Sequence, residues 1–200
     1  MTEGFRPAVV PFGLDAARVD LPPGADRAAV LAALLRVPGV LDAVVAETTA
    51  AFWFDPRGPT PDVATALTRP GPPVVGTAHT LPTRYDGPDL AAVAAHAGVS
   101  VAEVVARHAA RAYTVLFLGF VPGFAYLGEV DPVIALPRRA SPRPVVAAGA
   151  VALAGPHTGV YPGGTPGGWN LLGHTDAAAL WSAPGVPRLA IGDAVRFVPR

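Results

Sequence analysis

The stretch from Gly159 to Thr175 reads GVYPGGTPGGWNLLGHT, in which glycine and proline alternate with short apolar runs. Its segment Thr165-Pro166-Gly167-Gly168 does not suit the interior of a helix, because proline lacks a backbone donor and glycine weakens helices. We expect this segment to be a loop in which backbone segments approach closely. The run over residues 170–174 has the length and composition of a short strand. The stretch therefore indicates a β-rich region with tight turns.

The same pattern extends over the second half of the chain. From residue 113 onward, short apolar or β-branched runs alternate with proline and glycine turns, which is typical of a β-sandwich or a β-barrel. The runs are residues 113–118, 145–146, 150–153, 170–174, 188–190 and 194–198. Two helices are predicted ahead of them. One runs from Pro88 to about His96 and ends at Gly98, and the other opens with a capping box at 100–103 and reaches about Arg111.

The first part of the chain has a different periodicity. It predicts a strand over residues 17–21, a helix over 26–36, strands over 40–47 and 50–54, a helix from Thr60 to about Thr68, and a strand over 74–81. The order β-α-β-β-α-β is that of ferredoxin-like sandwiches. We therefore expect a ferredoxin-like α+β domain over residues 1–84, followed by a β-barrel domain over residues 85–200 with two leading helices.

The composition excludes several kinds of chemistry. The 200 residues include fifteen arginines, no lysine and no cysteine. Without lysine the chain cannot supply a Walker-type phosphate-binding lysine, a Schiff-base amine or an attachment point for biotin or lipoate. Without cysteine it has no thiolate nucleophile, disulfide, iron–sulfur cluster or cysteine zinc site. Any ATP-driven chemistry must therefore use arginines, loop amides and histidines of this chain, and any lysine must come from a partner.

The charge balance and the hydropathy pattern narrow the class of protein. Fifteen acidic residues match the fifteen basic ones, and such a neutral chain lacks the basic stripe of a nucleic-acid-binding protein. No apolar run approaches the roughly 20 residues that cross a bilayer. The N-terminus, MTEGFRPAVVPFG, has neither the charged nor the apolar region of a signal peptide. We expect a cytoplasmic protein that binds neither nucleic acid nor membranes.

Three histidines are candidates for acid–base chemistry. His157 and His174 lie 17 residues apart, and each could exchange a proton near neutral pH. Each could equally be a hydrogen-bonded structural residue. His108 falls on the apolar stripe of its predicted helix, so that a core position and a site position both stay open. Because the chain lacks cysteine and has no HExxH motif, we expect no metal site.

Three segments could bind a ligand or a partner. The arginines of LPRRASPR, residues 136–143, could pair with a carboxylate or a phosphate, although a solvated turn also explains such a cluster. The segment FLGFVPGFAYL, residues 117–127, could be buried core or an exposed aromatic face, with Phe120 and Phe124 pointing in different directions. The glycines and aromatic residues of the stretch 159–169 could present amides and a flat wall to an anion, or simply turn the chain.

Six motifs follow one another in a fixed order from Tyr85 to the end of the sequence. They are YDGPDL at 85–90, DLAAVAAHAGVSVAEVVARH at 89–108, FLGFVPGFAYL at 117–127, LPRRASPR at 136–143, AGPHTGVYPGGTPGGWNLLGHT at 154–175 and IGDAVRFVP at 191–199. Together they resemble the family of the 5-oxoprolinase B subunit, which includes the KipI kinase inhibitor and is also labelled allophanate hydrolase subunit 1 or carboxyltransferase domain. That family usually has serine, glutamine and arginine at the positions of Ala150, His157 and His174.

The resemblance implies a fold and a role. It implies a small α+β N-terminal domain followed by a cyclophilin-like β-barrel domain. It also implies a hydrolase subunit that works with subunits A and C, as part of a hetero-oligomer, in the ATP-dependent opening of 5-oxoproline to glutamate. ATP, with Mg²⁺, would then be a co-substrate of the complex, and no cofactor would be bound covalently.

Candidate roles follow from the residues and the resemblance together. The candidate catalytic residues are His157, His174 and His108. The candidate substrate- or nucleotide-binding residues are Arg138, Arg139, Arg143, Tyr161, Thr165, Gly167, Gly168 and Trp169. The candidate partner-binding residues are Phe120, Pro122, Gly123, Phe124 and Tyr126.

Two alternatives to the lactam hydrolase stay open at this point. One is a KipI-type regulatory protein that binds and inhibits a sensor histidine kinase through the aromatic segment at residues 119–127. The other is a carboxyltransferase- or allophanate-hydrolase-type subunit that acts on a urea-like substrate. This second alternative would need a biotin carrier on another chain, because this chain has no lysine to carry biotin.

Overall fold

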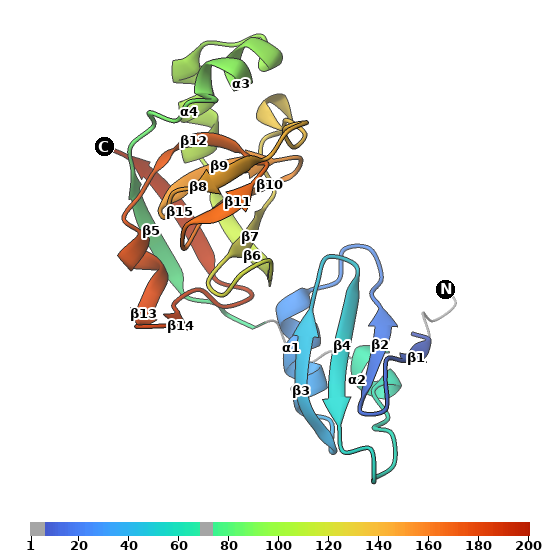
Figure 1. Cartoon of the computed structure of the whole chain (residues 1–200). Coiled ribbons are helices and arrows are strands. Elements are labelled where there is room, and N and C mark those ends of the chain that lie inside the picture. Colours follow the sequence, from blue (N-terminus) through green and yellow to red (C-terminus); the bar gives the residue numbers. More distant parts are fainter. Residues whose placement is uncertain (1–6, 69–73) are drawn as a thin grey trace. The chain divides into compact units, whose positions relative to one another are not determined.

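The computed structural model describes residues 7–68 and 74–200 of the chain, which fold as two units with a division between Val75 and Gly76 (Figure 1). The first unit is a four-stranded sheet with two helices. The second unit is built on a seven-stranded sheet that nearly closes into a barrel, with further helices and two short ribbons around it. The chain is therefore a mixed α+β protein.

Four strands and two helices make up the first unit. They are β1 (Val9–Pro11), β2 (Ala16–Asp20), α1 (Arg27–Leu35), β3 (Val40–Val45), β4 (Thr49–Phe54) and α2 (Ala64–Thr68). The sheet order is β1-β2-β4-β3, and each neighbouring pair is antiparallel. Figure 1 shows both helices behind this sheet, and α1 contacts β3 and α2. The Asp26 carboxylate caps α1 by accepting from the Ala29 amide, as the sequence predicts.

The ferredoxin-like arrangement predicted for this unit is not confirmed, because the last strand of the pattern lies elsewhere. In place of a strand over 74–81, the structure has β5 (Ala78–Thr83), which pairs in parallel with β15 (Ala194–Pro199) of the second unit. The edge position beside β2 is taken by β1, which reaches it through a short connection at Gly13. A local hairpin closes a shorter loop than a strand that returns after α2, so it loses less chain entropy.

Two other boundaries differ from the sequence prediction. The structure divides the chain at 75/76, whereas the boundary expected from the sequence lies at 84/85. The helix predicted from Thr60 begins at Ala64, whose amide donates to the Asp62 carboxylate just ahead of the first turn. Val63 is fully buried just ahead of this turn.

The strands of the second unit are short, as the density of proline and glycine predicts. They are β6 (Ala112–Leu118), β7 (Ala125–Gly128), β8 (Arg143–Val146), β9 (Ala150–Ala154), β10 (His157–Val160), β11 (Thr165–Gly167), β12 (Asn170–His174), β13 (Trp181–Ala183) and β14 (Val186–Pro187). The large sheet has the order β12-β9-β10-β7-β6-β15-β5, and β8 with β11 and β13 with β14 form two ribbons. The strand predicted over 188–190 is wrong, because the chain there follows β14 without strand pairing.

The two edge strands of the large sheet are joined by the chain that follows β5. Arg84 exchanges both backbone hydrogen bonds with His174 of β12, at 2.9 and 2.8 Å between nitrogen and oxygen. Three residues further on, the Gly87 amide donates to the Leu172 carbonyl oxygen at 3.0 Å. The segment 84–89 therefore runs along β12 and nearly closes the sheet.

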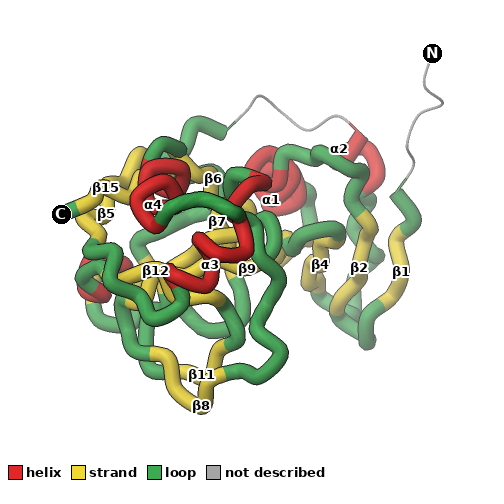
Figure 2. The backbone as a smooth tube through the Cα atoms, turned by 90° about the horizontal axis from the view of Figure 1, so that it is seen from above, coloured by secondary structure: helices red, strands yellow, loops and turns green. Residues whose placement is uncertain are grey.

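Two helices pack on the barrel-like sheet. They are α3 (Leu90–Ala97), which contacts β12, and α4 (Val101–Ala109), which contacts β15 (Figure 2). As predicted, Gly98 ends α3 in the left-handed conformation, with φ of 67°, and the Ser100 hydroxyl accepts from the Glu103 amide at the start of α4. Short 3₁₀ turns, η1 (Pro132–Ile134) and η2 (Ala177–Leu180), complete the unit.

Within residues 7–68 and 74–200, no single helix combines the length and the apolar character needed to cross a membrane. The pair α3 and α4 meets that length and composition test only when taken together, and the two helices are bent by 94° at the break between them.

Gly173 allows the closing segment to approach β12, because a Cβ atom at this position would overlap the carbonyl group of Arg84. We predict that Gly173→Ala lowers the free energy of unfolding by about 1–3 kcal/mol, the usual range for an overpacked site. Urea denaturation followed by circular dichroism measures the change. Gly163→Ala is the control, since a Cβ atom there meets nothing within 4 Å. Equal losses in the two variants would contradict the prediction.

Candidate functional site

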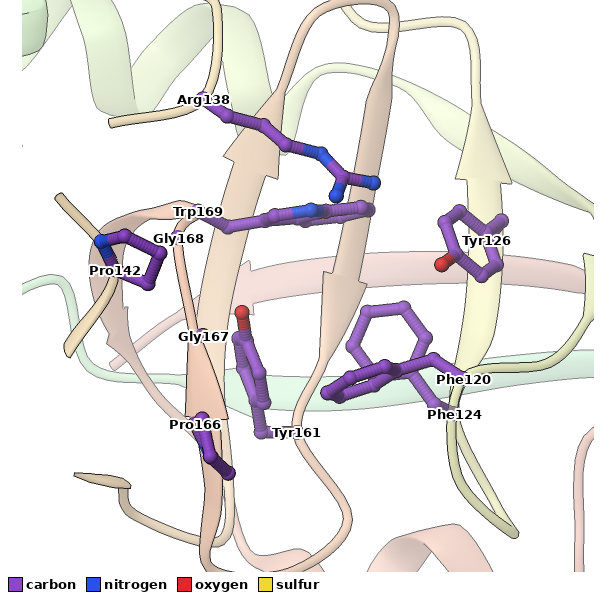
Figure 3. Close-up of a pocket in the computed structure, with 10 residues that line it drawn as sticks. All are labelled: Phe120, Phe124, Tyr126, Arg138, Pro142, Tyr161, Pro166, Gly167, Gly168 and Trp169. Carbon is purple, nitrogen blue, oxygen red and sulfur yellow. The ribbon is translucent and has the colours of Figure 1, made fainter. Parts of the chain in front are cut away.

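A cavity of about 240 Å³ opens on the second unit, between the β6–β7 loop, the chain around β11 and the segment that leads into β8 (Figure 3). It is lined by Phe120, Phe124, Tyr126, Arg138, Pro142, Tyr161, Pro166, Gly167, Gly168 and Trp169. All except Pro142 and Pro166 belong to the binding residues that the sequence singles out. The structure therefore brings the proposed ligand-binding and partner-binding segments together in one place.

Aromatic rings form one wall of the cavity. Phe124 is only 2% exposed, and its ring meets those of Tyr161 and Trp169 edge to face, with ring centroids 5.3 Å apart in both pairs. The Tyr126 ring lies 5.0 Å from Phe124 and 5.5 Å from Trp169. Figure 3 shows the Tyr126 hydroxyl pointing into the space between these rings. Such pairs each add about 0.5–1.5 kcal/mol beyond burial, so the wall is a firm, largely apolar surface.

Two glycines make room for these rings. A Cβ atom at Gly167 would overlap the phenol of Tyr161, and one at Gly159 would lie 3.3 Å from the Phe124 ring and 3.4 Å from the Trp169 ring. The close approach that the sequence predicts for the 165–168 segment is therefore an approach of backbone to an aromatic side chain. Part of this segment is also a short strand, β11, rather than a loop.

Phe120 stands at the exposed side of the cavity. Its side chain is 57% exposed, whereas Phe124 is buried, although both rings line the same cavity. Its backbone has a φ of 72°, in the left-handed region that costs a residue with a side chain about 1–2 kcal/mol. Residues held in such conformations cluster at binding sites. The Phe120 ring meets Phe124 edge to face at 5.6 Å, which helps to hold it.

Arg138 is the one charged residue among the described residues that line the cavity. Figure 3 shows its guanidinium group on the same side of the cavity as the Trp169 indole. Burial raises the pKa of Tyr161, and the positive charge of Arg138 offsets only part of this effect. The Tyr161 phenol is therefore protonated at neutral pH. The cavity thus offers a permanent positive charge, phenolic hydroxyls and flat apolar walls, which suit a small, planar anion.

The other two arginines of the cluster bind a carboxylate inside the protein. Arg139 Nη1 and Arg143 Nη2 each donate to Asp89 Oδ1 at 2.8 Å, and the Leu171 amide donates to Asp89 Oδ2 at 2.7 Å. The Asp89 side chain is only 5% exposed. Burial alone would raise the pKa of Asp89, but the bonds from Arg143 and Leu171 and the charge of both arginines together lower it. The carboxylate is ionised at neutral pH.

Sequence reasoning missed Asp89. Its position directly before an apolar helix is typical of a helix cap, and it does stand at the N-cap of α3. Its side chain makes no capping hydrogen bond there, however, because the carboxylate turns toward the two arginines and β12 instead. The only signal in the sequence was an aspartate between the Gly87-Pro88 turn and a helix, which does not reveal partners 50 or more residues away.

His108 lies in the core rather than at the cavity. It is fully buried, and both ring nitrogens have partners, with Nδ1 2.7 Å from the Tyr85 hydroxyl and Nε2 2.8 Å from Thr158 Oγ1. The Thr158 hydroxyl donates to the Ala152 carbonyl oxygen, so it accepts from His108 Nε2–H, and Nδ1 accepts from Tyr85. Burial lowers the pKa of His108 to about 3. This histidine is neutral and has no free nitrogen for a substrate.

The other two candidate histidines also lie outside the cavity lining. The His174 side chain is exposed, and its Nδ1 lies 2.9 Å from Asp86 Oδ1. His157 is partly buried, and its ring meets Phe117 and Tyr126 edge to face, at 5.6 and 5.9 Å. His157 therefore stands behind a ring of the cavity wall, and none of the three histidines contacts the cavity directly.

The remaining candidate residues support the cavity without lining it. Thr165 begins β11 and pairs with Val146 of β8, and Pro122 lies exposed in the β6–β7 loop. Gly123 has a φ of 84° and packs against the Trp181 ring, where a side chain would not fit. Over residues 7–68 and 74–200, no group of three or more histidine, aspartate or glutamate side chains is arranged to hold a metal ion.

The nearly closed sheet and its aromatic cavity define a known class of domain. A sequence model described as carboxyltransferase domain, subdomain C and D, matches residues 7–185, and the chain belongs to this family. The resemblance seen in the motifs is confirmed by curated relatives, each of which is named as the B subunit of 5-oxoprolinase. The protein of Escherichia coli O157:H7 is 54% identical over 115 residues, and that of Bacillus subtilis (strain 168) is 48% identical over 113 residues.

These alignments cover 57% and 56% of this chain, and 53% and 47% of the two relatives. The 5-oxoprolinase B subunit of Haemophilus influenzae (strain ATCC 51907 / DSM 11121 / KW20 / Rd) is 41% identical over 113 residues, which are 56% of this chain and 53% of that protein. The chain therefore spans about half the length of the curated relatives that it matches.

Solved structures show the same fold. TTHA0988 matches with a TM-score of 0.79 and 39% identity, over 92% of this chain and 39% of that one. PH0987 from Pyrococcus horikoshii matches with a TM-score of 0.58 and 30% identity, over 96% of this chain and 97% of that one. The Kluyveromyces lactis urea carboxylase, at 16% identity and a TM-score of 0.69, covers 98% of this chain and 23% of its own, and shows a likeness of fold alone.

The buried His108 sets a pH dependence of stability. Its pKa is about 3 in the folded chain and about 6.5 when unfolded, so between these values the unfolded chain binds one more proton. We predict that the free energy of unfolding falls as the pH is lowered from about 6.5 to 4, more steeply for the native chain than for His108→Gln. The difference in slope approaches about 1.4 kcal/mol per pH unit. Urea denaturation at a series of pH values measures both slopes, and equal slopes would contradict the assignment.

The strained backbone at Phe120 can be tested by exchanging glycine and alanine there. Because glycine adopts positive φ without strain, we predict that Phe120→Gly is more stable than Phe120→Ala by about 1 kcal/mol. Thr114, an exposed residue in the middle of β6, is the control. There the glycine variant should be the less stable one by about 0.5–1 kcal/mol, because glycine weakens a strand. The same order at both positions would show that Phe120 is not held in the strained conformation.

Proposed function

We propose that this chain is the substrate-binding part of the B subunit of an ATP-dependent 5-oxoprolinase, which opens 5-oxoproline to glutamate together with subunits A and C. The observation that carries the proposal is its 41–54% identity to three proteins named as the B subunit of 5-oxoprolinase. The cavity supports it independently, because its size and its chemistry suit a small cyclic amide that bears a carboxylate.

The size of the cavity favours 5-oxoproline over a nucleotide. Its volume of about 240 Å³ lies below the roughly 300–1,000 Å³ of sites for drug-sized ligands. In the proposed complex the guanidinium of Arg138 pairs with the carboxylate of 5-oxoproline, since arginine binds this group in a bidentate fashion. The lactam ring packs against the indole of Trp169, and a tyrosine hydroxyl donates to the lactam oxygen.

Such an arrangement would serve lactam opening mainly by positioning and by charge. Amide resonance protects the ring, and phosphorylation of the lactam oxygen by ATP removes that protection and makes the carbon electrophilic. Water then adds to this carbon, the ring C–N bond breaks with a proton passing to nitrogen, and hydrolysis releases the phosphate. Arg138 holds the substrate in place through these steps, while the apolar walls keep bulk water away.

The remaining chemistry belongs to other chains in this proposal. The described residues that line the cavity include no carboxylate and no histidine, so the groups that move protons are supplied from outside this set. The chain also has no lysine, and arginine is the cation that it presents at the cavity. A site completed by subunits A and C, with ATP and Mg²⁺ bound mainly there, would supply both.

The histidine-kinase alternative has less support. It requires the segment at residues 119–127 to present an exposed aromatic face. Phe124 is instead buried, Tyr126 is half-buried, and both line the cavity together with Phe120. The carboxyltransferase alternative rests on the description of the matching family model and on structural neighbours at 16% identity, which share the fold alone.

The test is the formation of glutamate from 5-oxoproline and ATP by the complex assembled from whole subunits. Omitting this protein should abolish the reaction. Arg138→Ala should raise the KM for 5-oxoproline by about 10- to 100-fold, because a hydrogen bond to a charged group contributes about 1.5–3 kcal/mol. Arg57→Ala is the control, since the Arg57 side chain is 88% exposed in the first unit. An unchanged rate without this protein, or an unchanged KM for Arg138→Ala, would overturn the proposal.

A further inference from the structure

The buried carboxylate of Asp89 contacts both segments that form the cavity. Of its three partners, Arg139 directly follows the lining residue Arg138, and Arg143 directly follows the lining residue Pro142. The third partner, the amide of Leu171, lies two residues beyond the lining residue Trp169. The carboxylate of Asp89 therefore bridges two segments of the chain. One is the arginine segment, residues 135–143, and the other is the tryptophan segment, residues 168–171.

The arginine segment is held in place by hydrogen bonds to its neighbours rather than by a helix or a strand of its own. Between η1 and β8, residues 135–142 form no helix or strand. Hydrogen bonds tie this segment to its neighbours: the Arg139 amide donates to the Gly168 carbonyl oxygen at 2.7 Å, and the Asn170 side-chain amide donates to the Pro137 carbonyl oxygen at 2.9 Å. The Gly155 amide also donates to the Leu136 carbonyl oxygen. Arg143 is opposite Gly167 in the β8–β11 ribbon. The two bonds to the Asp89 carboxylate, each of 2.8 Å, fix Arg139 and Arg143, the residues that directly follow Arg138 and Pro142.

We propose that Asp89 is a positioning residue of the substrate cavity, whose carboxylate fixes Arg139 and Arg143 and thereby aims Arg138 across Trp169 at the ligand. The identity of the ligand rests on the proposed 5-oxoprolinase function, but the geometry that Asp89 imposes does not. Arg139 and Arg143 are then internal anchors, and Arg138 is the only one of the three arginines that binds the substrate.

Both the negative charge and the orientation of the Asp89 carboxylate are needed to hold the two arginines. An asparagine in its place has one oxygen and one donor NH₂ group, so it cannot accept from the two guanidinium groups on one side and from the Leu171 amide on the other. It would also leave the two arginines without their counter-charge. An aspartate at a helix N-cap ordinarily binds its own helix, whereas Asp89 makes no such bond, so its carboxylate serves the cavity segments instead of α3.

The chain contains a matched control for this substitution. Asp131 also accepts from one backbone amide, that of Val133 at 3.0 Å, and also pairs with two arginines, Arg107 at 3.2 Å and Arg111 at 3.7 Å. None of these four residues lines the cavity. Asp131→Asn therefore disturbs an ion cluster of the same composition without touching the cavity segments.

The first experiment detects a change in the structure of the cavity without a bound ligand. The indole N–H resonance of Trp169, assigned with Trp169→Phe, is compared by two-dimensional NMR in the native chain, Asp89→Asn and Asp131→Asn. We expect this resonance to move or to split in Asp89→Asn and to stay in place in Asp131→Asn. An unmoved resonance in Asp89→Asn, or equal changes in both variants, would overturn the proposal.

The second experiment measures the reaction of the assembled complex. Asp89→Asn should raise the KM for 5-oxoproline by about 10- to 100-fold, the effect of a misplacement of about 1 Å, with a much smaller change in kcat. Asp131→Asn should leave both constants within about twofold of the native values. If the native complex does not use 5-oxoproline at all, the proposed function fails, while the indole resonance still decides the role of Asp89.

A second pair of variants covers the case in which Asp89→Asn does not fold. Arg139→Met removes one of the two arginine anchors of Asp89, and Arg111→Met removes the corresponding arginine of the control cluster. The two side chains are 38% and 44% exposed. We expect Arg139→Met to move the Trp169 resonance and to raise the KM by about tenfold, and Arg111→Met to do neither. A native resonance and KM in Arg139→Met would overturn the proposal.

Discussion

Burial of the Asp89 carboxylate requires hydrogen-bond donors and positive charge, and the second unit is arranged to supply both. The amide comes from Leu171 in β12, so this pairing continues the contact by which the segment 84–89 nearly closes the sheet. The guanidinium groups come from Arg139 and Arg143, so the same carboxylate also anchors one wall of the cavity. The carboxylate that adds to the closing contact is therefore the same group that we propose sets the shape of the binding site.

The cavity shows how this chain presents positive charge to a ligand, which the composition alone does not reveal. A chain without lysine or cysteine has to present charge through arginine, and in this cavity a single arginine, Arg138, stands among aromatic rings. The other members of the arginine cluster are used inside the protein. In the proposed function this leaves substrate binding to the present chain and assigns the ATP and the proton-transfer groups to its partners. Membership of the carboxyltransferase-domain family and the named relatives agree with a subunit role.

Local patterns in the sequence predict those parts of the structure that local interactions determine. The helix caps at Asp26 and Ser100, the stop at Gly98 and the strand over 170–174 are all found where they are predicted. The partner of a strand is a long-range property, however, and β5 joins β15, more than 100 residues away, rather than the first sheet. The motifs likewise predict most of the cavity lining. They do not show that His108 is sealed in the core or that Asp89 faces two arginines, because burial is decided by the whole fold.

The central claim is that a single carboxylate sets the geometry of the cavity, and crystal structures of the native chain and of Asp89→Asn test it most directly. We expect the sheet to be retained in the variant, while the segment from Arg138 to Arg143 shifts and the Arg138 guanidinium leaves its place beside Trp169. A variant structure in which these residues superpose on the native positions, with the cavity unchanged, would contradict it.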